Sequence, residues 1–293
     1  MPSSIAAYRE RRFSAQDGLR LYARDYGDRL SAGRPMVCLT GLTRNTKDYH
    51  DLALRHAARR RVVCSDYRGR GRSAYDPDWR NYQPEVYVRD LMSMMAALGL
   101  HGIVVCGTSL GGLLAMGLAA ATPAVLAGVI LNDIGPDIHP GGLSRIMNYV
   151  GVDRPQEDWD GAIAYLKQLF GPAHFETEAK WRSFAEATYR QGEDRLLHYD
   201  WDTALAKPLL RAGGKTPDLW PLYRALGRIP VLALRGETSD VLSQATFDRM
   251  AEVKPDLIRV TVPKVGHTPS LDEPEAEQAI DTFLARLDEA QGN

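Results

Sequence analysis

Short unbroken runs of apolar residues alternate along the chain with longer stretches of helical pattern. Such runs are typical of strands buried on both faces of a sheet, and their alternation with helices predicts parallel strand pairing. The apolar runs lie at residues 36–40, 61–65, 103–106, 128–132, 230–235 and 257–262. Helical patterns lie at residues 46–60, 84–98, 113–120 and 274–287. The core is therefore predicted to be an α/β sheet with helices on both faces.

Two further strands are predicted at the start of the chain. Residues 8–14 and 19–26 each alternate between apolar and polar positions, and Asp17-Gly18 lies between them. An Asp-Gly pair between two alternating segments is a strong signal for a β-hairpin. With the six buried runs, this hairpin gives a mostly parallel sheet of eight strands.

The alternation stops at Asp133 and resumes at Pro230. The intervening stretch is rich in aromatic residues and helical patches, and it contains no run that reads as a buried strand. We therefore predict an α/β core made of residues 1–133 and 229–293, with a helical cap of residues 134–228 inserted after the sixth strand.

One predicted strand leads into a G-x-S-x-G motif, residues 107–111, and a helical pattern of small residues leads out of it. A strand, a tight turn and a helix form a nucleophile elbow, which holds the serine in a strained conformation above the sheet. Glycine is needed at Gly107 and Gly111, because a side chain at either position would clash with the neighbouring strand or helix. Ser109 is therefore the predicted nucleophile.

Composition narrows the classes of function. The formal net charge of −1 gives no sign of a nucleic-acid or anionic-membrane partner, and 44% hydrophobic residues are ordinary for a globular protein. The first twelve residues contain no apolar run typical of a secretory signal, so we expect a cytoplasmic location. Cys38, Cys64 and Cys106 lie inside apolar runs, where buried reduced thiols are favoured over a disulfide. Their spacing, like that of the histidines, fits no metal motif.

A serine nucleophile needs a base and an acid that orients the base, both at the carboxyl ends of later strands. His267 follows the last predicted strand, and Asp240 follows the one before it, so the order Ser109, Asp240, His267 suits an elbow of this kind. Asp133, directly after the strand at 128–132, is the main alternative acid. Glu237 is a weaker one.

These motifs resemble those of the α/β-hydrolase superfamily from about residue 8 to residue 288. The residues that carry the resemblance are Thr40-Gly41-Leu42, Asp66-x-Arg68-Gly69-x-Gly71-x-Ser73, Gly107-x-Ser109-x-Gly111-Gly112, Asp240 and Gly266-His267. The resemblance implies serine-dependent hydrolysis with no cofactor and no metal, beneath a cap that shapes substrate choice. The backbone N–H groups of Leu42 and Leu110 would form the oxyanion hole. Thr40-Gly41 stands where the family commonly has His-Gly.

The favoured reaction is hydrolysis of a carboxylic ester or lactone, with a small hydrophobic carbonyl compound as substrate. The alternative is hydrolytic C–C cleavage of a diketo acid, which needs a cationic clamp from Arg44, Arg68 or Arg145. A ligand-binding receptor that retains the fold is a third reading. The basic run Arg68 to Arg72 is interpreted as a loop in which Arg68 pairs with Asp66, and His139 as a residue that could reach the pocket. The oligomeric state is left open.

Overall fold

The fold is described by a computed structural model, which covers residues 7–139, 141, 146–147, 149–171, 175–211, 213 and 217–292. Its centre is a sheet of eight strands in the order β1-β2-β4-β3-β5-β6-β9-β10. The strands are β1 (Arg9–Ser14), β2 (Arg20–Tyr26), β3 (Gly33–Leu39), β4 (Arg60–Asp66), β5 (Ile103–Thr108), β6 (Leu126–Asn132), β9 (Val231–Gly236) and β10 (Ile258–Val262). Only the pairs β1–β2 and β2–β4 are antiparallel, so the predicted hairpin and the mostly parallel sheet are both confirmed.

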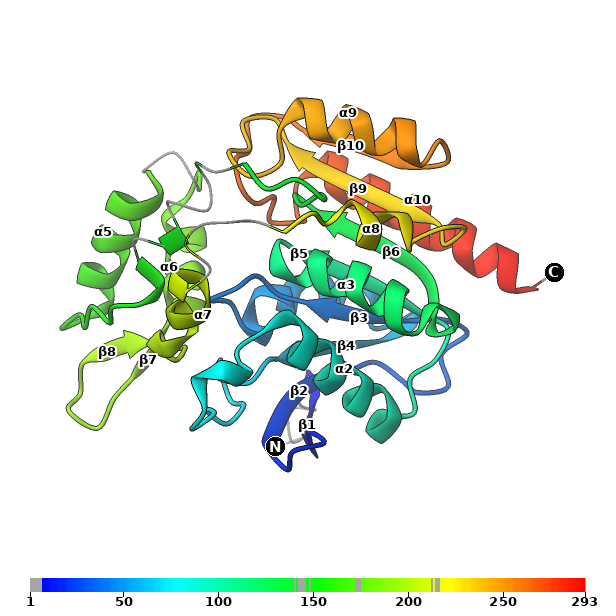
Figure 1. The fold of residues 1–293 in the computed structure, drawn as a ribbon. Helices are drawn as coiled ribbons and strands as arrows, with labels where there is room; N and C mark the ends of the chain where they lie inside the picture. Colours follow the sequence, from blue (N-terminus) through cyan, green and yellow to red (C-terminus); the bar gives the residue numbers. More distant parts are fainter. Residues whose placement is uncertain are drawn as a thin grey trace, which may run out of the picture.

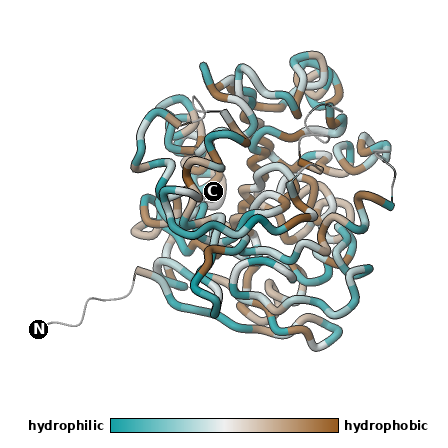
Figure 2. Tube along the Cα trace, turned by 90° about the vertical axis from the view of Figure 1, so that its left-hand side faces the viewer, coloured by the Kyte–Doolittle hydropathy of each residue, from teal (hydrophilic) through white to brown (hydrophobic). Residues whose placement is uncertain are grey.

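Helices cover both faces of this sheet (Figure 1). One face carries α1 (His50–His56) and α10 (Pro274–Gly292), and the other carries α2 (Pro84–Leu98), α3 (Leu110–Ala121), α8 (Trp220–Arg224) and α9 (Gln244–Val253). Successive residues of a strand point to opposite faces, so Met36 and Cys38 pack on the first face, and Val37 and Leu39 on the second. In Figure 2 the hydrophobic stretches accordingly gather inside the trace, and hydrophilic stretches predominate around its outline.

Helix α2 begins and ends where the helical pattern at residues 84–98 predicted. Pro84 occupies the first turn, where its missing N–H costs nothing, and Gly99 ends the helix in the left-handed conformation at φ 61°. The helix predicted at 46–60 is shorter than expected: a 3₁₀ turn, η1 (Thr46–Tyr49), precedes α1, and the chain then turns into β4. Helix α9 was not predicted, although Ser243 caps its first turn through the Thr246 N–H. Two further 3₁₀ turns, η2 (Trp79–Asn81) and η3 (Pro123–Val125), lie in loops.

Between β6 and β9 the chain leaves the sheet and forms a separate group of elements to one side (Figure 1). These are α5 (Trp159–Phe170), α6 (Glu178–Thr188), β7 (Tyr189–Gln191), β8 (Leu197–Tyr199), η4 (Thr203–Leu205) and α7 (Ala206–Arg211). The hairpin of β7 and β8 was not expected, because three-residue strands are too short to show an alternating pattern. The segment ends with α8, which packs on α3. The division into two domains at residues 134 and 228 stays a prediction.

All three cysteines are buried and free, as predicted. Cys38 lies opposite both Cys64 and Cys106 in the register of the neighbouring strands. Burial raises the pKa of the Cys106 thiol to about 12, so this sulfur stays protonated and unreactive at neutral pH. None of the helices in the described ranges combines the length and the hydropathy needed to cross a membrane.

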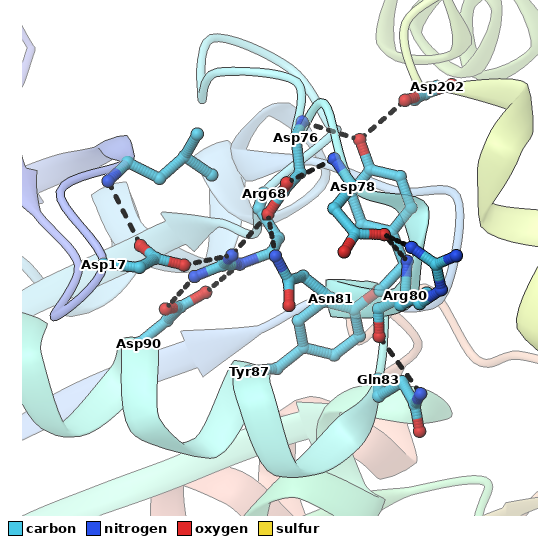
Figure 3. A network of polar contacts seen from close by, with 12 residues as sticks. Asp17, Arg68, Asp76, Asp78, Arg80, Asn81, Gln83, Tyr87, Asp90 and Asp202 are labelled. Carbon is cyan, nitrogen blue, oxygen red and sulfur yellow. Dashed lines mark hydrogen bonds and ion pairs between the residues drawn. The ribbon is translucent and has the colours of Figure 1, made fainter.

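Arg68 is the centre of a buried ionic network, and this corrects the interpretation of its loop (Figure 3). Its guanidinium donates to both oxygens of Asp90 at 2.6 and 2.7 Å, to Asp76 at 2.6 Å and to Asp17 at 2.7 Å. The predicted pair of Arg68 with Asp66 is wrong. Asp66 instead accepts the backbone N–H groups of Thr46 and Arg72. Arg68 therefore ties the first hairpin and α2 to the loop after β4.

We expect Arg68→Met to lower the free energy of unfolding by about 3–5 kcal/mol, because it leaves the buried carboxylates of Asp90 and Asp76 without a counter-charge. Urea denaturation at pH 7 measures the change. Arg72→Met is the matched control, since Arg72 is half-exposed and pairs with the exposed Glu10. It should change stability by less than about 1 kcal/mol. Equal losses in the two variants would contradict the assigned role of Arg68.

A second prediction concerns His56, which lies buried at the end of α1. Burial, together with the charge of Arg55, lowers the pKa of His56 to about 4. Between that pH and the usual value of about 6.5 the unfolded chain binds a proton that the folded chain does not, so stability falls as the pH falls. From pH 7 to pH 5 we expect the free energy of unfolding to fall by about 2 kcal/mol because of this residue. Urea denaturation of the native chain and His56→Gln at both pH values measures it, with His101→Gln, at an exposed site, as control.

Candidate active site

Ser109 lies in the turn between β5 and α3, in a backbone conformation that L-residues rarely adopt. Its φ is 52° and its ψ is −116°. The two glycines beside it are required by close packing: a Cβ at Gly107 would lie 2.4 Å from the carbonyl oxygen of Gly111, and one at Gly111 would lie 2.0 Å from that of Leu39. The turn has the strained geometry expected of a nucleophile elbow, in which the serine hydroxyl stands clear of the sheet.

His267 lies in the loop after β10 and contacts the serine. Its Nε2 is 3.1 Å from Ser109 Oγ, within hydrogen-bond distance. Its Nδ1 is 2.7 Å from Oδ2 of Asp133. The structure thus brings together a hydroxyl, an imidazole and a carboxylate from the carboxyl ends of three different strands. This is the arrangement that a serine nucleophile requires.

The acid in contact with His267 is Asp133, which corrects the preference for Asp240. Asp133 directly follows β6, which lies between β5 and β9 in the sheet, so its carboxylate is held beside both the elbow and the histidine loop. Its side chain is fully buried and its φ is 55°. Oδ1 accepts the Gly236 N–H at 2.8 Å, and Oδ2 accepts the Ser239 hydroxyl at 2.6 Å. The weaker alternative, Glu237, accepts the backbone N–H of Lys264.

A buried polar network holds the elbow and the histidine loop together. The Tyr49 hydroxyl lies 2.7 Å from Oγ1 of Thr108, the residue before Ser109. Asn132 donates from Nδ2 to the same Thr108 oxygen at 3.0 Å and to the carbonyl of Pro269 at 2.9 Å. Because Pro269 lies two residues beyond the histidine, Asn132 fixes the loop that presents the imidazole. Sequence reasoning did not identify Tyr49, Thr108 or Asn132 as supporting residues.

The two proposed oxyanion donors come from two different segments of the core. Leu110 is the first residue of α3, and Leu42 follows β3, the strand beside β5. Within the described part of the chain, no backbone hydrogen bond uses the N–H of either residue. A side chain on Gly41 would have its Cβ 3.8 Å from that of Ser109, so the loop approaches Ser109 closely. Both N–H groups are therefore available to a ligand beside Ser109.

A cavity of about 330 Å³ lies between the core and the elements inserted after β6, and Ser109 and His267 form part of its wall. The inserted segment contributes a largely apolar and aromatic wall, which includes Tyr149, Leu166, Leu169, Phe170, Phe175, Phe184 and Trp201. The rings contact one another edge to face, for example Phe170 and Phe184 with centroids 5.3 Å apart. A concave apolar site with a few polar groups at one end is typical of sites for small organic ligands.

Charged side chains also line this cavity, and two of the basic ones, Arg44 and Lys180, are paired with carboxylates. Arg44 donates two hydrogen bonds to Asp48, at 2.6 and 2.7 Å, and a third to Thr188 Oγ1 at 2.6 Å. Lys180 of α6 pairs with Asp272 of the loop after β10 at 3.0 Å. Of the other predicted contacts, Arg145 lies outside the described residues, Arg68 is held in its own network, and His139 is exposed.

In the ranges that the structure describes, no cluster of three or more His, Cys, Asp or Glu side chains is placed to hold a metal ion. The reactive geometry at Ser109 is built from the chain's own hydroxyl, imidazole, carboxylate and backbone N–H groups. Such a set can move protons and stabilise an oxyanion.

Comparison with known proteins agrees with this geometry. The model of the Alpha/beta hydrolase family matches residues 36–279. A 3-hydroxybutyrate-oligomer hydrolase of Cupriavidus necator is 34% identical over 87% of this chain and 89% of that protein. A 2-(acetamidomethylene)succinate hydrolase of Mesorhizobium japonicum is 28% identical over 86% and 88%. The crystal structure of an alpha/beta hydrolase from Novosphingobium aromaticivorans superposes with a TM-score of 0.90 at 44% identity, covering 97% of this chain and all of that one. This chain therefore belongs to the alpha/beta hydrolase family.

Proposed function

We propose that the protein is a serine hydrolase that cleaves a carboxylic ester or lactone through an acyl-enzyme at Ser109. The observation that carries this proposal is the continuous path from Ser109 Oγ through His267 to Asp133, with contacts of 3.1 and 2.7 Å. A hydroxyl is a weak nucleophile at neutral pH, and a base within hydrogen-bond distance makes it reactive. Ser109 and His267 line a cavity whose inserted wall is largely apolar, which suits a small hydrophobic substrate.

The acylation step follows from this geometry. Ser109 Oγ attacks the carbonyl carbon while its proton passes to His267 Nε2. Asp133 holds the proton on Nδ1, so that Nε2 is free to accept, and stabilises the imidazolium that forms. The carbonyl oxygen becomes an oxyanion and accepts hydrogen bonds from the N–H groups of Leu42 and Leu110. The C–O bond to the leaving alcohol then breaks, and the alcohol takes the proton from Nε2.

Deacylation repeats these steps with water. His267 accepts a proton from the water molecule as it attacks the acyl carbon, and it returns that proton to Ser109 when the acid leaves. No further group is needed for the proton balance. The same machinery opens a lactone, in which case the alcohol and the acid leave as one molecule.

Two observations favour an ester over the C–C bond of a diketo acid. The relative that is 34% identical is a 3-hydroxybutyrate-oligomer hydrolase, and oligomers of a hydroxy acid are joined by ester bonds. A diketo acid would also need a cationic side chain to bind its carboxylate, and the candidate arginines that the structure describes already have other partners. Arg68 is surrounded by carboxylates, and both ends of the Arg44 guanidinium are held by Asp48 and Thr188. The contact between His267 and Ser109 also disfavours a receptor without turnover, because a binding protein does not need a base beside a hydroxyl.

Labelling with a fluorophosphonate probe tests the nucleophile directly. We expect stoichiometric labelling, and peptide mapping should place the adduct on Ser109. A panel of p-nitrophenyl esters with increasing acyl length, together with γ- and δ-lactones, then defines the substrate range. Labelling at another residue would contradict the proposal. Inactivity on every ester and lactone, with rapid decolouration of a dienol keto acid, would favour C–C cleavage instead.

A further inference from the structure

In the loop that carries the Leu42 N–H, the carbonyl oxygens next to that group all accept hydrogen bonds. Thr40, Gly41 and Leu42 supply three successive carbonyl oxygens, and each accepts a hydrogen bond. The donors are, in order, the Tyr67 hydroxyl at 3.1 Å, the Arg44 N–H at 3.2 Å and Arg70 Nε at 2.8 Å. The peptide that bears the Leu42 N–H therefore lies between two fixed neighbours. Since a peptide group is planar, this N–H points opposite to the Gly41 carbonyl of the same peptide. The hydrogen bonds to the Thr40 and Leu42 carbonyls hold the two adjoining peptides and so limit rotation of that plane.

Arg70, which donates to the Leu42 carbonyl, is a buried arginine in an unusual environment. Its side chain is fully buried, yet no carboxylate among the described residues lies within 4.0 Å of its nitrogens. Two neutral oxygens accept from its Nη1, the Arg68 carbonyl at 2.8 Å and the Tyr87 hydroxyl at 2.9 Å. The guanidinium also lies 4.7 Å from the centre of the Tyr87 ring and 5.5 Å from that of Tyr67. Its positive charge is thus held beside the loop without being neutralised by a carboxylate.

The backbone of Arg70 is joined to the inserted segment. Arg70 forms an antiparallel bridge with Trp201, whose indole lines the cavity. On either side, the Gly71 N–H donates to the Asp200 carbonyl at 2.9 Å, and the Asp202 N–H donates to the Gly69 carbonyl at 2.8 Å. One residue therefore connects the wall of the cavity with the loop beside Ser109.

We propose that Arg70 is the positioning residue of the oxyanion hole: by donating to the Leu42 carbonyl it aims the Leu42 N–H at the oxyanion. This inference rests on the proposed function. It explains how a loop with Thr40-Gly41 keeps its shape, since Tyr67 and Arg70 hold it from the loop after β4. An N–H group that is displaced by about 1 Å from its hydrogen-bonding position beside the oxyanion loses most of its effect on the rate.

Arg70→Met, which keeps much of the volume and removes the donors, tests the inference. We expect kcat for a p-nitrophenyl ester to fall about 100-fold, the loss typical of one oxyanion donor, while KM changes less than about threefold. The inhibition constant of a trifluoromethyl ketone, which forms an oxyanion on the serine, should rise by a similar factor. A non-reactive methylene analogue of that ketone should bind as before. Arg70→Lys, which keeps the charge and a donor, should recover at least tenfold in kcat.

Arg72→Met is the matched control, because this arginine of the same loop points outward and is half-exposed. We expect its kcat and its trifluoromethyl ketone affinity to match those of the native chain. Circular dichroism and melting temperature report whether each variant folds. If both Arg70 variants fail to fold, Tyr87→Phe decides the matter, because it removes only the hydroxyl that accepts from Arg70. It should lower kcat several-fold at unchanged KM.

The inference is overturned if a folded Arg70→Met keeps kcat and trifluoromethyl ketone affinity within twofold of the native values. It is also overturned if Arg70→Met weakens the ketone and its non-reactive analogue equally, since that is a general loss of binding. Failure of the proposed function has a different signature: the native chain itself would hydrolyse no ester, or its labelling would survive Ser109→Ala.

Discussion

Ser109→Ala is expected to lower kcat for ester hydrolysis about a million-fold, the largest effect of any single change in this chain. Without the hydroxyl, His267 has no oxygen to activate and no acyl-enzyme can form. Substrate binding should persist, because the apolar wall of the cavity is untouched. Steady-state kinetics and a stopped-flow search for a burst of p-nitrophenol measure the loss. The burst should disappear together with labelling by a fluorophosphonate.

The control for this change is stability. Serine and alanine are strained alike at the φ of 52° that residue 109 adopts. The free energy of unfolding should therefore change by less than about 1 kcal/mol. Ser93→Ala, on the exposed side of α2, serves as a serine variant outside the site. A Ser109→Ala protein that keeps more than one per cent of native activity would show that another nucleophile acts here.

Local sequence signals were sufficient to predict an element where its backbone requires a particular type of residue. Asp17-Gly18 predicted the hairpin of β1 and β2, and the helical pattern at residues 84–98 gave the bounds of α2. Gly107 and Gly111 placed the elbow, because only glycine fits against the backbone atoms that surround them. These signals are readable in a sequence since each acts within a few residues of its cause.

The sequence favoured Asp240 as the acid, whereas the structure places Asp133 against His267, because that contact depends on packing across the sheet. Asp240 was favoured because it follows the strand before His267 and gives the expected order Ser109, Asp240, His267, and an order along the chain does not measure distance in space. The structure instead brings Asp133 to the imidazole, through the order of β5, β6 and β9 and the N–H of Gly236. A signal was present: Asp133 directly follows a buried strand, whereas Asp240 lies four residues beyond the end of β9. An acid at a strand end is held more rigidly than one further along a loop.

The support of the oxyanion loop could not be predicted for a similar reason. Arg70 looked like one of three arginines in a basic run, yet their side chains have three different environments. Arg68 lies among carboxylates, Arg70 is buried against tyrosines and a carbonyl, and Arg72 is half-exposed beside Glu10. Turns at Gly69 and Gly71, with φ of 74° and 53°, send the three side chains in these directions. Nothing in the spacing of the arginines encodes that result.

The second large effect is expected from Asp133→Asn, which should lower kcat about ten-thousand-fold while the fold persists. The Gly236 N–H donates to Oδ1, so the asparagine oxygen is expected to face Gly236, and its NH₂ group then faces His267. A donor beside Nδ1 favours the imidazole tautomer that carries its proton on Nε2. That tautomer cannot accept the proton of Ser109. The measurement is kcat on the best ester of the panel.

Asp240→Asn is the matched control, because it makes the same chemical change at the acid that the sequence favoured. We expect its kcat to stay within about threefold of the native value, since the imidazole is held by Asp133. The pair of variants separates the two assignments without reference to absolute rates. If Asp240→Asn were the inactive protein and Asp133→Asn the active one, the contact seen at 2.7 Å would not be the one used in the reaction. A ten-thousand-fold loss confined to Asp133→Asn would instead show that the order of strands in the sheet, and not the order of residues along the chain, selects the acid.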